Sequence, residues 1–555
     1  MRQSFHCGMT GSNQIKAEKI DIPPISDVIS VKDPVVIESE YPAYLFDESK
    51  MTGWADFLFF PRSEGELASA LKFLREKGAS SYISGARTGI AGSAVPQGGG
   101  IISTEKMTGF TGLGWDETLN RYFIGVKSAV TLSEIERVLV SKRGEGLSDL
   151  TPGALTRFKE DAPHHYPVDP TERGASIGGT VATNASGART FKYGATRDWV
   201  RRIRIMLASG DILDITRGEY HAQDGRFVIE LPNGQERDVP VPKYHGTFGR
   251  DLKNAAGICA YDGMDLIDLF IGSEGVLGII TLVEVWLEEM RPQFSTVLFL
   301  DDLDSALEFV MRLRSDQAIV PEYIELLDGR SLQLLRDVQR ILPTNLGVPP
   351  IPVDAGSAIL FDIPFSEENI GIDLERIGSL ANQCGSSLAR SWCGHDRRDL
   401  ERFSDFRHAV PETVNTIIAQ RKREYPAMHK LGTDISVPDE NLSKMMSFYT
   451  SMMESSGLEY VIFGHIGDNH PHLNILPRNQ EELERGNALY REFARMAVGL
   501  GGSVSAEHGI GKLKRDFLKI MYGDEGVEEM RRLKRSLDPS WILSPGNIFE
   551  PEVGN

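Results

Sequence analysis

The sequence predicts an α+β protein in which a ligand-binding first half precedes a domain built on an antiparallel sheet. Two observations support this prediction. Glycine-rich segments adjoin apolar, strand-like runs at residues 84–93, 175–187 and 272–280. After Pro292, strand-like runs alternate with helical ones, as in a sheet with helices packed on one face. The length of 555 residues allows two to four domains.

Composition excludes several functional classes. The net charge of −19 makes a general nucleic-acid surface improbable, so an anionic ligand must be held by local cations and backbone N–H groups. The four cysteines form no Cys-x-x-Cys pair, which predicts neither an iron–sulfur cluster nor a disulfide framework. There is no run of 18 apolar residues, and residues 1–14 lack a secretory h-region. We therefore expect a protein of a reducing compartment with no transmembrane segment.

The chain opens with a proline-rich arm up to residue 56, which we expect to be loosely structured. A strand at residues 57–60 and a helix with a Ser63/Glu66 capping box follow, and that helix ends at Gly78. Residues 81–84 form the next predicted strand. The order strand, helix, strand is that of a βαβ unit.

Three glycine-rich loops follow in the first half. Residues 85–93 match neither the dinucleotide fingerprint nor the P-loop, although their backbone N–H groups and Arg87 suit a phosphate. A single loop of this kind is most often only a turn. The small residues of 175–187 and the segment 272–280 form two more such loops. Together the three loops predict one extended ligand lying across them.

The second half alternates between strands and helices. Strands are expected at residues 296–300 and 358–361, and helices at 305–314 and 369–384. A basic stretch from Arg407 to Lys430 lies in this acidic chain, and such runs are usually solvated. Residues 432–438 read as a strand that ends at a proline, and a helix at 531–537 is followed by a late turn at 544–547.

Residues 464–474 contain three histidines between two apolar runs, which predicts a β-hairpin. With a two-residue turn at Asp468-Asn469, His465 would pair with His472, and Asn474 would lie across from Phe463. Directly opposed residues share one face, with Cβ atoms about 4.5–5.5 Å apart, so the two imidazoles could hold one metal ion. An isolated histidine is more often a satisfied core residue, but a group of three weakens that alternative.

The segment 503–511 places Glu507 and His508 side by side in a loop of small residues. Both could face one centre where the backbone turns, which Gly509 permits. His465, His472 and Glu507 would then form an N2O set with open positions, suited to zinc, manganese or iron in a catalytic site. His508 would remain free to move protons.

These motifs support a resemblance to a known family. The loop 84–93, the run 176–187, Lys192-Tyr193-Gly194 and the segment 272–278 resemble the FAD-binding domain of the vanillyl-alcohol oxidase flavoprotein superfamily. The segments 464–474, 506–509 and 543–547 resemble its D-2-hydroxy-acid dehydrogenase branch, which includes D-lactate dehydrogenase, the glycolate oxidase flavin subunit and D-2-hydroxyglutarate dehydrogenase. The resemblance covers residue 47 to the end.

The resemblance implies a domain plan and a set of flavin contacts. It implies an N-terminal arm (1–56), a two-subdomain FAD-binding domain (57–291), an α+β substrate and metal domain (292–530) and a C-terminal helical segment returning to the flavin (531–555). No histidine lies in the loop 85–92, so we expect non-covalent FAD. The implied cofactor-binding residues are Ser84, Gly85, Ala86, Arg87, Thr88, Gly89, Gly92, Ser93, Pro170, Ser176, Gly178, Gly179, Thr183, Asn184, Gly187, Gly194, Glu274, Gly275, Gly278, Ile279 and Asn547.

The resemblance also implies a catalytic set. His465, His472 and Glu507 match the metal ligands, and His508 matches the base; Asn474 matches a substrate contact and Arg407 the arginine that binds the substrate carboxylate. There are two departures from the family pattern. His470 stands inside the metal motif and could perturb the ligand set. Gly432 occupies the position of a lysine that precedes the aspartate matching Asp434, and Lys430 would replace that lysine only in part.

The implied activity is FAD-dependent, metal-assisted oxidation of a D-2-hydroxy acid, with D-lactate first and glycolate or D-2-hydroxyglutarate as alternatives. Electrons would leave to oxygen, a quinone, a cytochrome or a partner redox subunit. Other readings are an alkyl-transferring or sugar-oxidising relative, or an electron-transfer subunit, but those chemistries do not need the paired histidines with Glu507-His508. The expected location is cytoplasmic, with peripheral contact at the inner membrane and a homodimer left open.

Overall fold

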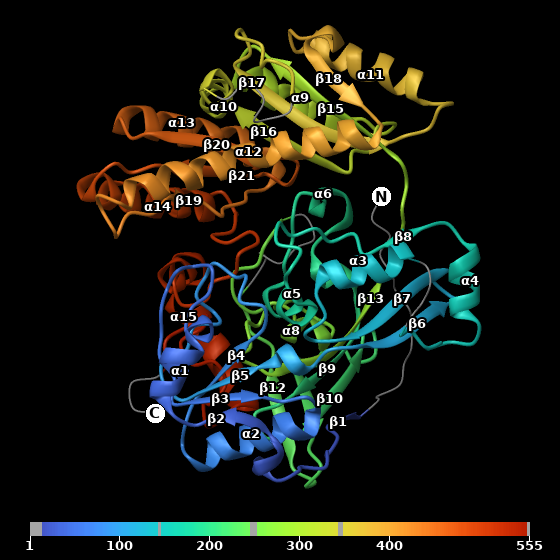
Figure 1. The fold of residues 1–555 in the computed structure, drawn as a ribbon, viewed down its shortest axis with the longest axis vertical. Coiled ribbons are helices and arrows are strands. Elements are labelled where there is room, and N and C mark those ends of the chain that lie inside the picture. The colour runs from blue at the N-terminus through green and yellow to red at the C-terminus, as the bar shows by residue number, and fades with distance from the viewer. Residues whose placement is uncertain (1–13, 142–145, 245–251, 342–347, 552–555) are drawn as a thin grey trace.

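The computed structural model describes residues 14–141, 146–244, 252–341 and 348–551, which form two lobes (Figure 1). The lower lobe in that view holds the first half of the chain together with its C-terminal helix. The upper lobe holds the second half up to α14. This is the predicted α+β architecture. No helix among the described residues is long and apolar enough to cross a membrane.

The lower lobe begins with a small sheet of order β2-β3-β5-β4, in which β3, β5 and β4 run parallel. Its helix α2 (Glu64–Glu76) begins as predicted, because the Ser63 hydroxyl accepts the N–H of Glu66 at 3.2 Å. The Glu66 carboxylate accepts the N–H of Arg62 at 2.9 Å, so it reaches one residue further back than a capping box requires. The strands are β2 (Ile29–Val31), β3 (Phe57–Phe60), β4 (Ser81–Ser84) and β5 (Gly100–Ser103).

The expectation of a loosely structured arm is wrong for its described part. Strand β2 pairs with β3, and α1 (Pro34–Glu40) begins at Asp33, whose carboxylate accepts the N–H of Val35. Asp followed by Pro is an N-cap and first-turn signal, so the prolines that suggested disorder include one that starts a helix.

A five-stranded antiparallel sheet of order β10-β9-β13-β7-β6 forms the second part of the lower lobe. Its strands are β6 (Phe110–Asp116), β7 (Arg121–Lys127), β9 (Val200–Met206), β10 (Ile212–Thr216) and β13 (Ile279–Trp286). The helices of this part of the chain are α3 (Leu132–Ser141), α4 (Ala154–Glu160), α5 (Ile177–Thr183), α6 (Thr190–Tyr193), α7 (Thr196–Trp199) and α8 (Ile267–Phe270). Smaller sheets are formed by β1 (Ile15–Lys16), β11 (Arg226–Glu230) and β12 (Glu236–Pro240), and by β8 (His164–His165) and β14 (Glu288–Glu289).

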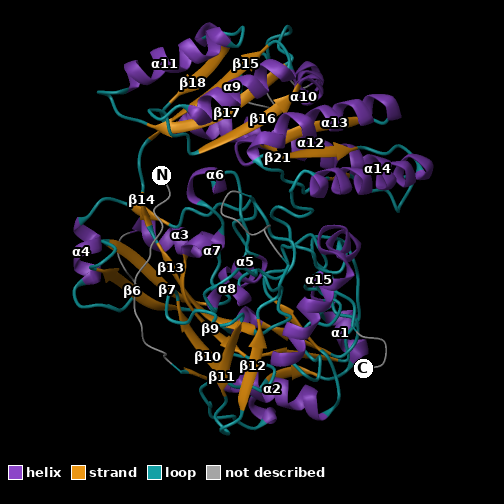
Figure 2. Cartoon of the chain, turned by 180° about the vertical axis from the view of Figure 1, so that it is seen from behind, coloured by secondary structure: helices purple, strands orange, loops and turns teal. Residues whose placement is uncertain are grey.

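The upper lobe is a seven-stranded, wholly antiparallel sheet of order β18-β15-β17-β16-β20-β21-β19, as the second half of the sequence predicted (Figure 2). Its strands are β15 (Gln293–Leu300), β16 (Tyr323–Asp328), β17 (Ser357–Pro364), β18 (Ser391–Gly394), β19 (Leu431–Gly432), β20 (Tyr460–His465) and β21 (His470–Ile475). Its helices are α9 (Leu303–Ser315), α10 (Gly329–Ile341), α11 (Ile370–Gln383), α12 (Arg397–Arg421), α13 (Leu442–Ser456) and α14 (Gln480–Gly499).

The chain then returns to the lower lobe. Helix α15 (Arg515–Leu537) is followed by residues 542–544, which add to the edge of β4. The N–H of Ser81 donates to the carbonyl of Ile542 at 2.6 Å, and the N–H of Ser544 donates back to the carbonyl of Ser81 at 2.7 Å. The end of the chain therefore completes the first sheet.

The strand predicted at residues 432–438 is mostly absent. Only Leu431–Gly432 pair as β19, and the Thr433 carbonyl turns to the side chain of His472. The side chain of Asp434 collects N–H groups from residues 506–508. This segment therefore supports a neighbouring loop instead of continuing the sheet.

Candidate active site

The hairpin β20–β21 places three histidines on one face. The register differs from the prediction: a turn at Ile466–Asp468 lets His465 pair with His470, Phe463 with His472 and Val461 with Asn474. The shift is an even number of residues, so the same side chains stay on the same face. Gly464 (φ +104°) is required here, because a Cβ would lie 2.7 Å from His472 Cδ2.

Oxygen atoms next to Nδ1 fix the orientation of the His465 and His472 rings. Glu325 Oε1 lies 2.5 Å from His465 Nδ1, and the Thr433 carbonyl lies 3.0 Å from His472 Nδ1. The Nε2 atoms of both rings then point to Glu507, each 3.4 Å from a carboxylate oxygen. In protein metal sites a histidine ligand usually donates the N–H of one ring nitrogen to an acceptor and binds the metal through the other nitrogen.

Asp434 holds the loop that carries Glu507. This fully buried carboxylate accepts the N–H groups of Ala506, Glu507 and His508 at 3.1–3.2 Å and pairs with Lys514 Nζ at 2.6 Å. Gly509 adopts φ +75°, the turn that the sequence predicted, and a Cβ there would lie 2.9 Å from Glu274 Oε1. The loop is therefore shaped by a buried anion and by a glycine that no other residue could replace without strain.

The electrostatics of the cluster favour a cation. Burial raises the pKa of Glu507, but Lys253 and the neighbouring histidines outweigh it and hold that pKa well below the usual range. Burial lowers the pKa of His465, and the Glu325 carboxylate opposes this so that the pKa rises to about 9. Three carboxylates, those of Glu325, Asp434 and Glu507, thus surround the imidazoles.

His508 lies at the open side of the cluster, with 28% of its side chain exposed. Its Nδ1 is 3.3 Å from Asp434 Oδ2 and its Nε2 is 3.3 Å from Glu507 Oε1. Its ring stacks near that of His472 at 5.8 Å between centroids. The imidazole is oriented by a carboxylate and has access to solvent, as a proton-transfer group needs.

The other predicted catalytic residues have different surroundings. Arg407, on α12, lies over the ring of Tyr323 at 5.1 Å and has no carboxylate within 4.0 Å among the described residues. Asn474 is buried opposite Gly432, where a Cβ would be 3.2 Å from its Oδ1. Lys430 makes no ion pair within the described part of the chain, and burial lowers its pKa.

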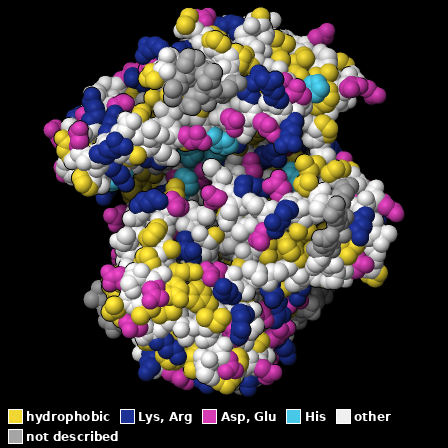
Figure 3. All heavy atoms as spheres, viewed as in Figure 1, with side chains coloured by type: hydrophobic (Ala, Val, Ile, Leu, Met, Phe, Trp, Pro, Cys, Tyr) yellow, Lys and Arg dark blue, Asp and Glu magenta, His cyan; other side chains and the backbone are white. Residues whose placement is uncertain are grey.

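Two lysines that the sequence analysis missed supply positive charge, namely the buried Lys253 and Lys514, whose side chain is 15% exposed. Lys253 Nζ lies 2.8 Å from Glu507 Oε2 and 3.2 Å from the Gly187 carbonyl, which joins the two lobes at the site. Lys514 pairs with Asp434. Lys514 follows the Glu507-His508 motif closely in the sequence and could have been considered, whereas no local pattern marks Lys253. Histidine side chains are visible at the waist between the lobes in Figure 3.

The three glycine-rich loops meet in the lower lobe. A Cβ on Gly85 would lie 2.8 Å from Ser176 Oγ, and one on Gly179 would lie 3.0 Å from the same atom. Ser176 Oγ is buried and has no hydrogen-bond partner among the described residues. The N–H of Glu274 donates to the Ala182 carbonyl at 2.8 Å, which brings the third loop to the second. This cradle of bare backbone around an unpartnered hydroxyl fits a phosphate-bearing cofactor such as FAD.

Glu274 and Asn547 brace these loops. The Glu274 carboxylate accepts the N–H groups of Ile510 and Gly511 at 2.7 and 2.8 Å and the Ser93 hydroxyl. The Asn547 amide donates to the carbonyls of Ser93 and Glu274, and its Oδ1 accepts from buried Lys512 at 2.6 Å. These contacts connect the cofactor loops to the loop that carries Glu507.

The remaining predicted cofactor residues lie in the three glycine-rich loops or in segments next to them in the sequence. Several glycines allow close packing: an added Cβ would meet Ser128 at Gly178, Asp169 at Gly187, Asp198 at Gly194, Ser544 at Gly275 and Ile205 at Gly278. Arg87 donates to Ser84 Oγ at 3.1 Å and lies over Tyr44. Ala86, Thr88, Gly89 and Gly92 lie in the loop after β4, Pro170 precedes α5, Thr183 and Asn184 end α5, and Ile279 begins β13.

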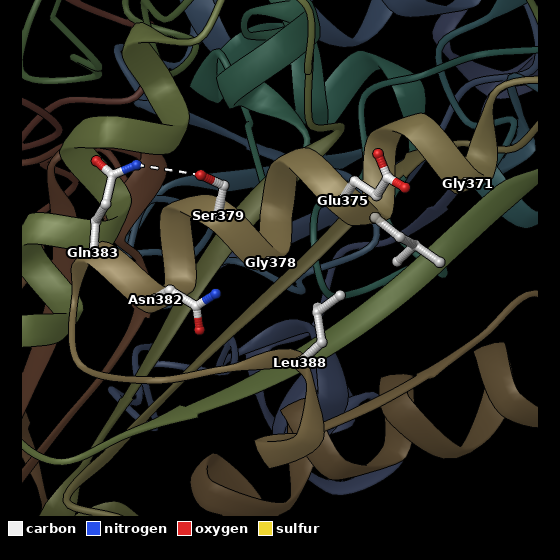
Figure 4. Close-up of a pocket in the computed structure, with 8 residues that line it drawn as sticks. Gly371, Glu375, Gly378, Ser379, Asn382, Gln383 and Leu388 are labelled. Atoms are coloured by element: carbon white, nitrogen blue, oxygen red, sulfur yellow. Dashed lines mark hydrogen bonds between the residues drawn. The ribbon is translucent and has the colours of Figure 1, made fainter.

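A surface groove on α11 is separate from this site. It is lined by Leu374, Gly378, Gln383 and Leu388, and the Gln383 amide donates to Ser379 Oγ at 3.4 Å (Figure 4). None of its residues belongs to the histidine cluster or the glycine-rich loops.

Comparison with known proteins agrees with this geometry. An FAD binding domain model matches residues 55–158 and 151–216, and a model of the C-terminal domain of FAD linked oxidases matches residues 290–548. The chain belongs to the FAD-linked oxidases. It is therefore an FAD-linked oxidoreductase.

Curated relatives specify the branch. The chain is 25% identical to the glycolate oxidase subunit GlcD of Bacillus subtilis over 506 residues (90% of each chain). It is 25% identical to a D-lactate dehydrogenase of Archaeoglobus fulgidus over 491 residues (88% of this chain, 90% of that protein). It is 24% identical to a D-2-hydroxyglutarate dehydrogenase of Stutzerimonas stutzeri over 516 residues (89% and 90%). The protein is thus a member of the D-2-hydroxy-acid branch, as its motifs indicated.

The fold is also that of a solved structure. A structure of alkyldihydroxyacetonephosphate synthase superposes with a TM-score of 0.58 at 14% identity and covers 95% of this chain and 88% of that one. At this identity the likeness concerns the fold alone.

Proposed function

We propose that the protein oxidises a D-2-hydroxy acid to the 2-oxo acid, with D-lactate as the first candidate and glycolate and D-2-hydroxyglutarate as alternatives. The observation that carries this proposal is the convergence of His465, His472 and Glu507, with their donor atoms facing one another and His508 beside them. The curated relatives named for these three acids support the substrate class.

His465, His472 and Glu507 would hold a divalent ion, because their N2O set and the acceptors behind both rings suit zinc, manganese or iron. When bound, such an ion supplies Lewis acidity that lowers the pKa of a coordinated hydroxyl. His508 Nε2 takes the proton of the substrate hydroxyl. Asp434 keeps the ring in position through Nδ1.

Arg407 would bind the substrate carboxylate. Its guanidinium has no competing carboxylate within 4.0 Å in the described chain, and burial against Tyr323 restricts its motion. A bidentate pair at this position orients the substrate and excludes one enantiomer from the productive pose. Asn474 would contact the same substrate from β21, and Lys430, which makes no ion pair within the described part of the chain, would add positive charge.

The glycine-rich loops would hold FAD through the residues around Gly85, Ser176 and Glu274. FAD supplies the acceptor for the two electrons and the hydrogen that leave the substrate Cα as hydride. In this scheme residues 57–291 form the cofactor domain, residues 292–530 the substrate domain, and residues 531–555 a segment that closes on the cofactor. An external acceptor, either oxygen, a quinone, a cytochrome or a partner subunit, would reoxidise the flavin. A cytoplasmic location, with contact at the inner membrane if the acceptor is a quinone, belongs to the same proposal.

Anaerobic flavin reduction tests the proposal. D-lactate, glycolate and D-2-hydroxyglutarate should be compared with L-lactate, with and without a chelator. We expect rapid bleaching by a D-acid or by glycolate, none by L-lactate, loss after chelation and recovery with added Zn²⁺ or Mn²⁺. Equal reduction by both lactates, or reduction that chelation does not affect, would contradict it.

The variant His508→Ala separates the base from the ligands. We expect the reduction rate to fall by about 10²–10⁴-fold, the range for a lost general base, with unchanged FAD and metal content. Unchanged turnover would remove His508 from the mechanism.

A further inference from the structure

His470 lies on the same face of the hairpin as His465 and His472, and its side chain is fully buried. Neither ring nitrogen makes a hydrogen bond with the described residues. Burying a polar group without a partner is costly, so such a group in a native structure calls for a ligand.

The ring is aimed into the cluster. His470 Nδ1 lies 3.9 Å from Glu507 Oε2, and His470 Nε2 lies 3.1 Å from Asp434 Oδ1, outside the angular range of a hydrogen bond. The potential ligand atoms of His465, His470, His472 and Glu507 all lie within 4.8 Å of one another.

The environment of His470 repeats that of the other two imidazoles. In His465 and His472 one nitrogen faces an acceptor, Glu325 or the Thr433 carbonyl, while the other faces Glu507. In His470 the acceptor is Asp434 and the nitrogen left for the cluster is Nδ1. A small rotation of the ring would convert the 3.1 Å contact into an N–H···O bond and leave a lone pair on Nδ1.

We propose that His470 is a third imidazole ligand, so that the site presents three nitrogens and one carboxylate and selects Zn²⁺ over Mn²⁺. Imidazole donors suit zinc, whereas manganese favours carboxylate and water oxygens. This inference depends on the divalent ion of the proposed function, but it adds a residue that is not among the three ligands His465, His472 and Glu507. With four protein ligands, substrate would bind as a fifth ligand, a coordination number that zinc can reach in catalytic sites.

Zinc X-ray absorption of the full-length protein counts the imidazoles directly. We expect three in the unaltered protein, two in His470→Asn and His470→Phe, and three in the control His165→Asn, whose ring lies at β8 away from the cluster. Asn keeps a polar group in the buried site and Phe keeps the ring volume, so at least one variant should fold.

Competition with a chromophoric chelator gives the affinity of each protein for Zn²⁺ and for Mn²⁺. Loss of His470 should weaken Zn²⁺ binding by about 100-fold, the upper end of what a lost supporting group costs, and should weaken Mn²⁺ binding much less. If the metal is held by two imidazoles in the unaltered protein and in all variants, His470 is not a ligand and the proposed function stays intact. Failure of the unaltered protein to bind either ion would overturn both.

Discussion

Replacing Asp434 with Asn tests whether one buried carboxylate organises the site. Asp434 is fully buried, accepts three N–H groups from residues 506–508 and the Ser505 hydroxyl, and pairs with Lys514, whose side chain is 15% exposed. Asn removes the charge, leaving Lys514 without its buried partner, and turns an NH₂ group toward N–H donors. Removing one partner of a buried pair costs about 3–5 kcal/mol.

Urea unfolding at a fixed, saturating FAD concentration measures this cost, because bound ligand adds to apparent stability. We expect Asp434→Asn to lower the free energy of unfolding by about 3–5 kcal/mol and to reduce metal retention, because the Glu507 loop loses its acceptor. The control is Asp301→Asn, which breaks a pair with Arg390 whose Asp301 side chain is 60% exposed. Exposed pairs contribute about 0–1 kcal/mol. If Asp434→Asn unfolds within 1 kcal/mol of this control, the loop is held by other contacts and the reasoning fails.

Two further predictions concern the cofactor side. Gly85→Ala places a Cβ 2.8 Å from Ser176 Oγ, so FAD binding measured by flavin fluorescence should weaken while thermal unfolding of the apoprotein changes little. The control is Gly371→Ala, where nothing lies within 4 Å of the added Cβ, and this variant should bind FAD normally. Equal FAD affinity in both variants would argue against the cradle. Burial lowers the pKa of Lys512 from 10.5 to about 8, so between these pH values the unfolded chain binds more protons and stability rises with pH. Relative to that of Lys512→Met, the free energy of unfolding of the unaltered protein should rise by about 3 kcal/mol from pH 8 to 10.5, at about 1.4 kcal/mol per pH unit. If the difference in free energy of unfolding between the two proteins does not change with pH, Lys512 stays charged in the fold.

Local patterns predicted the parts of the site that lie within one segment. The histidine hairpin was placed on the correct face although its register was wrong, because a shift by an even number of residues preserves the alternation of a strand. The turn at Gly509 followed from the conformational freedom of glycine. The antiparallel sheet of the upper lobe followed from the alternation of strand and helix patterns.

Partners from distant segments could not be predicted in this way. Lys253, Glu325 and Asp434 each reach the cluster from a different part of the chain, and each is a single charged residue without a local pattern. The short strand β2 was missed because three residues are too few to show a period. Asp434 was hidden within an apparent strand because tertiary hydrogen bonds outweighed the strand propensity of its neighbours.

The pairing of residues 542–544 with β4 has a consequence for biosynthesis. Ser81 emerges early from the ribosome, but the partner of its side-chain and main-chain groups lies 461 residues later. Domains generally fold from the N-terminus during synthesis at about 5–20 residues per second, so the edge of β4 stays without its native partner for tens of seconds. Since Asn547 also braces the loops at Ser93 and Glu274, these loops reach their final form only after residue 547 has been synthesised. We therefore expect FAD to bind after residue 547 has been synthesised, and chaperones that cover exposed strand edges to act before that moment.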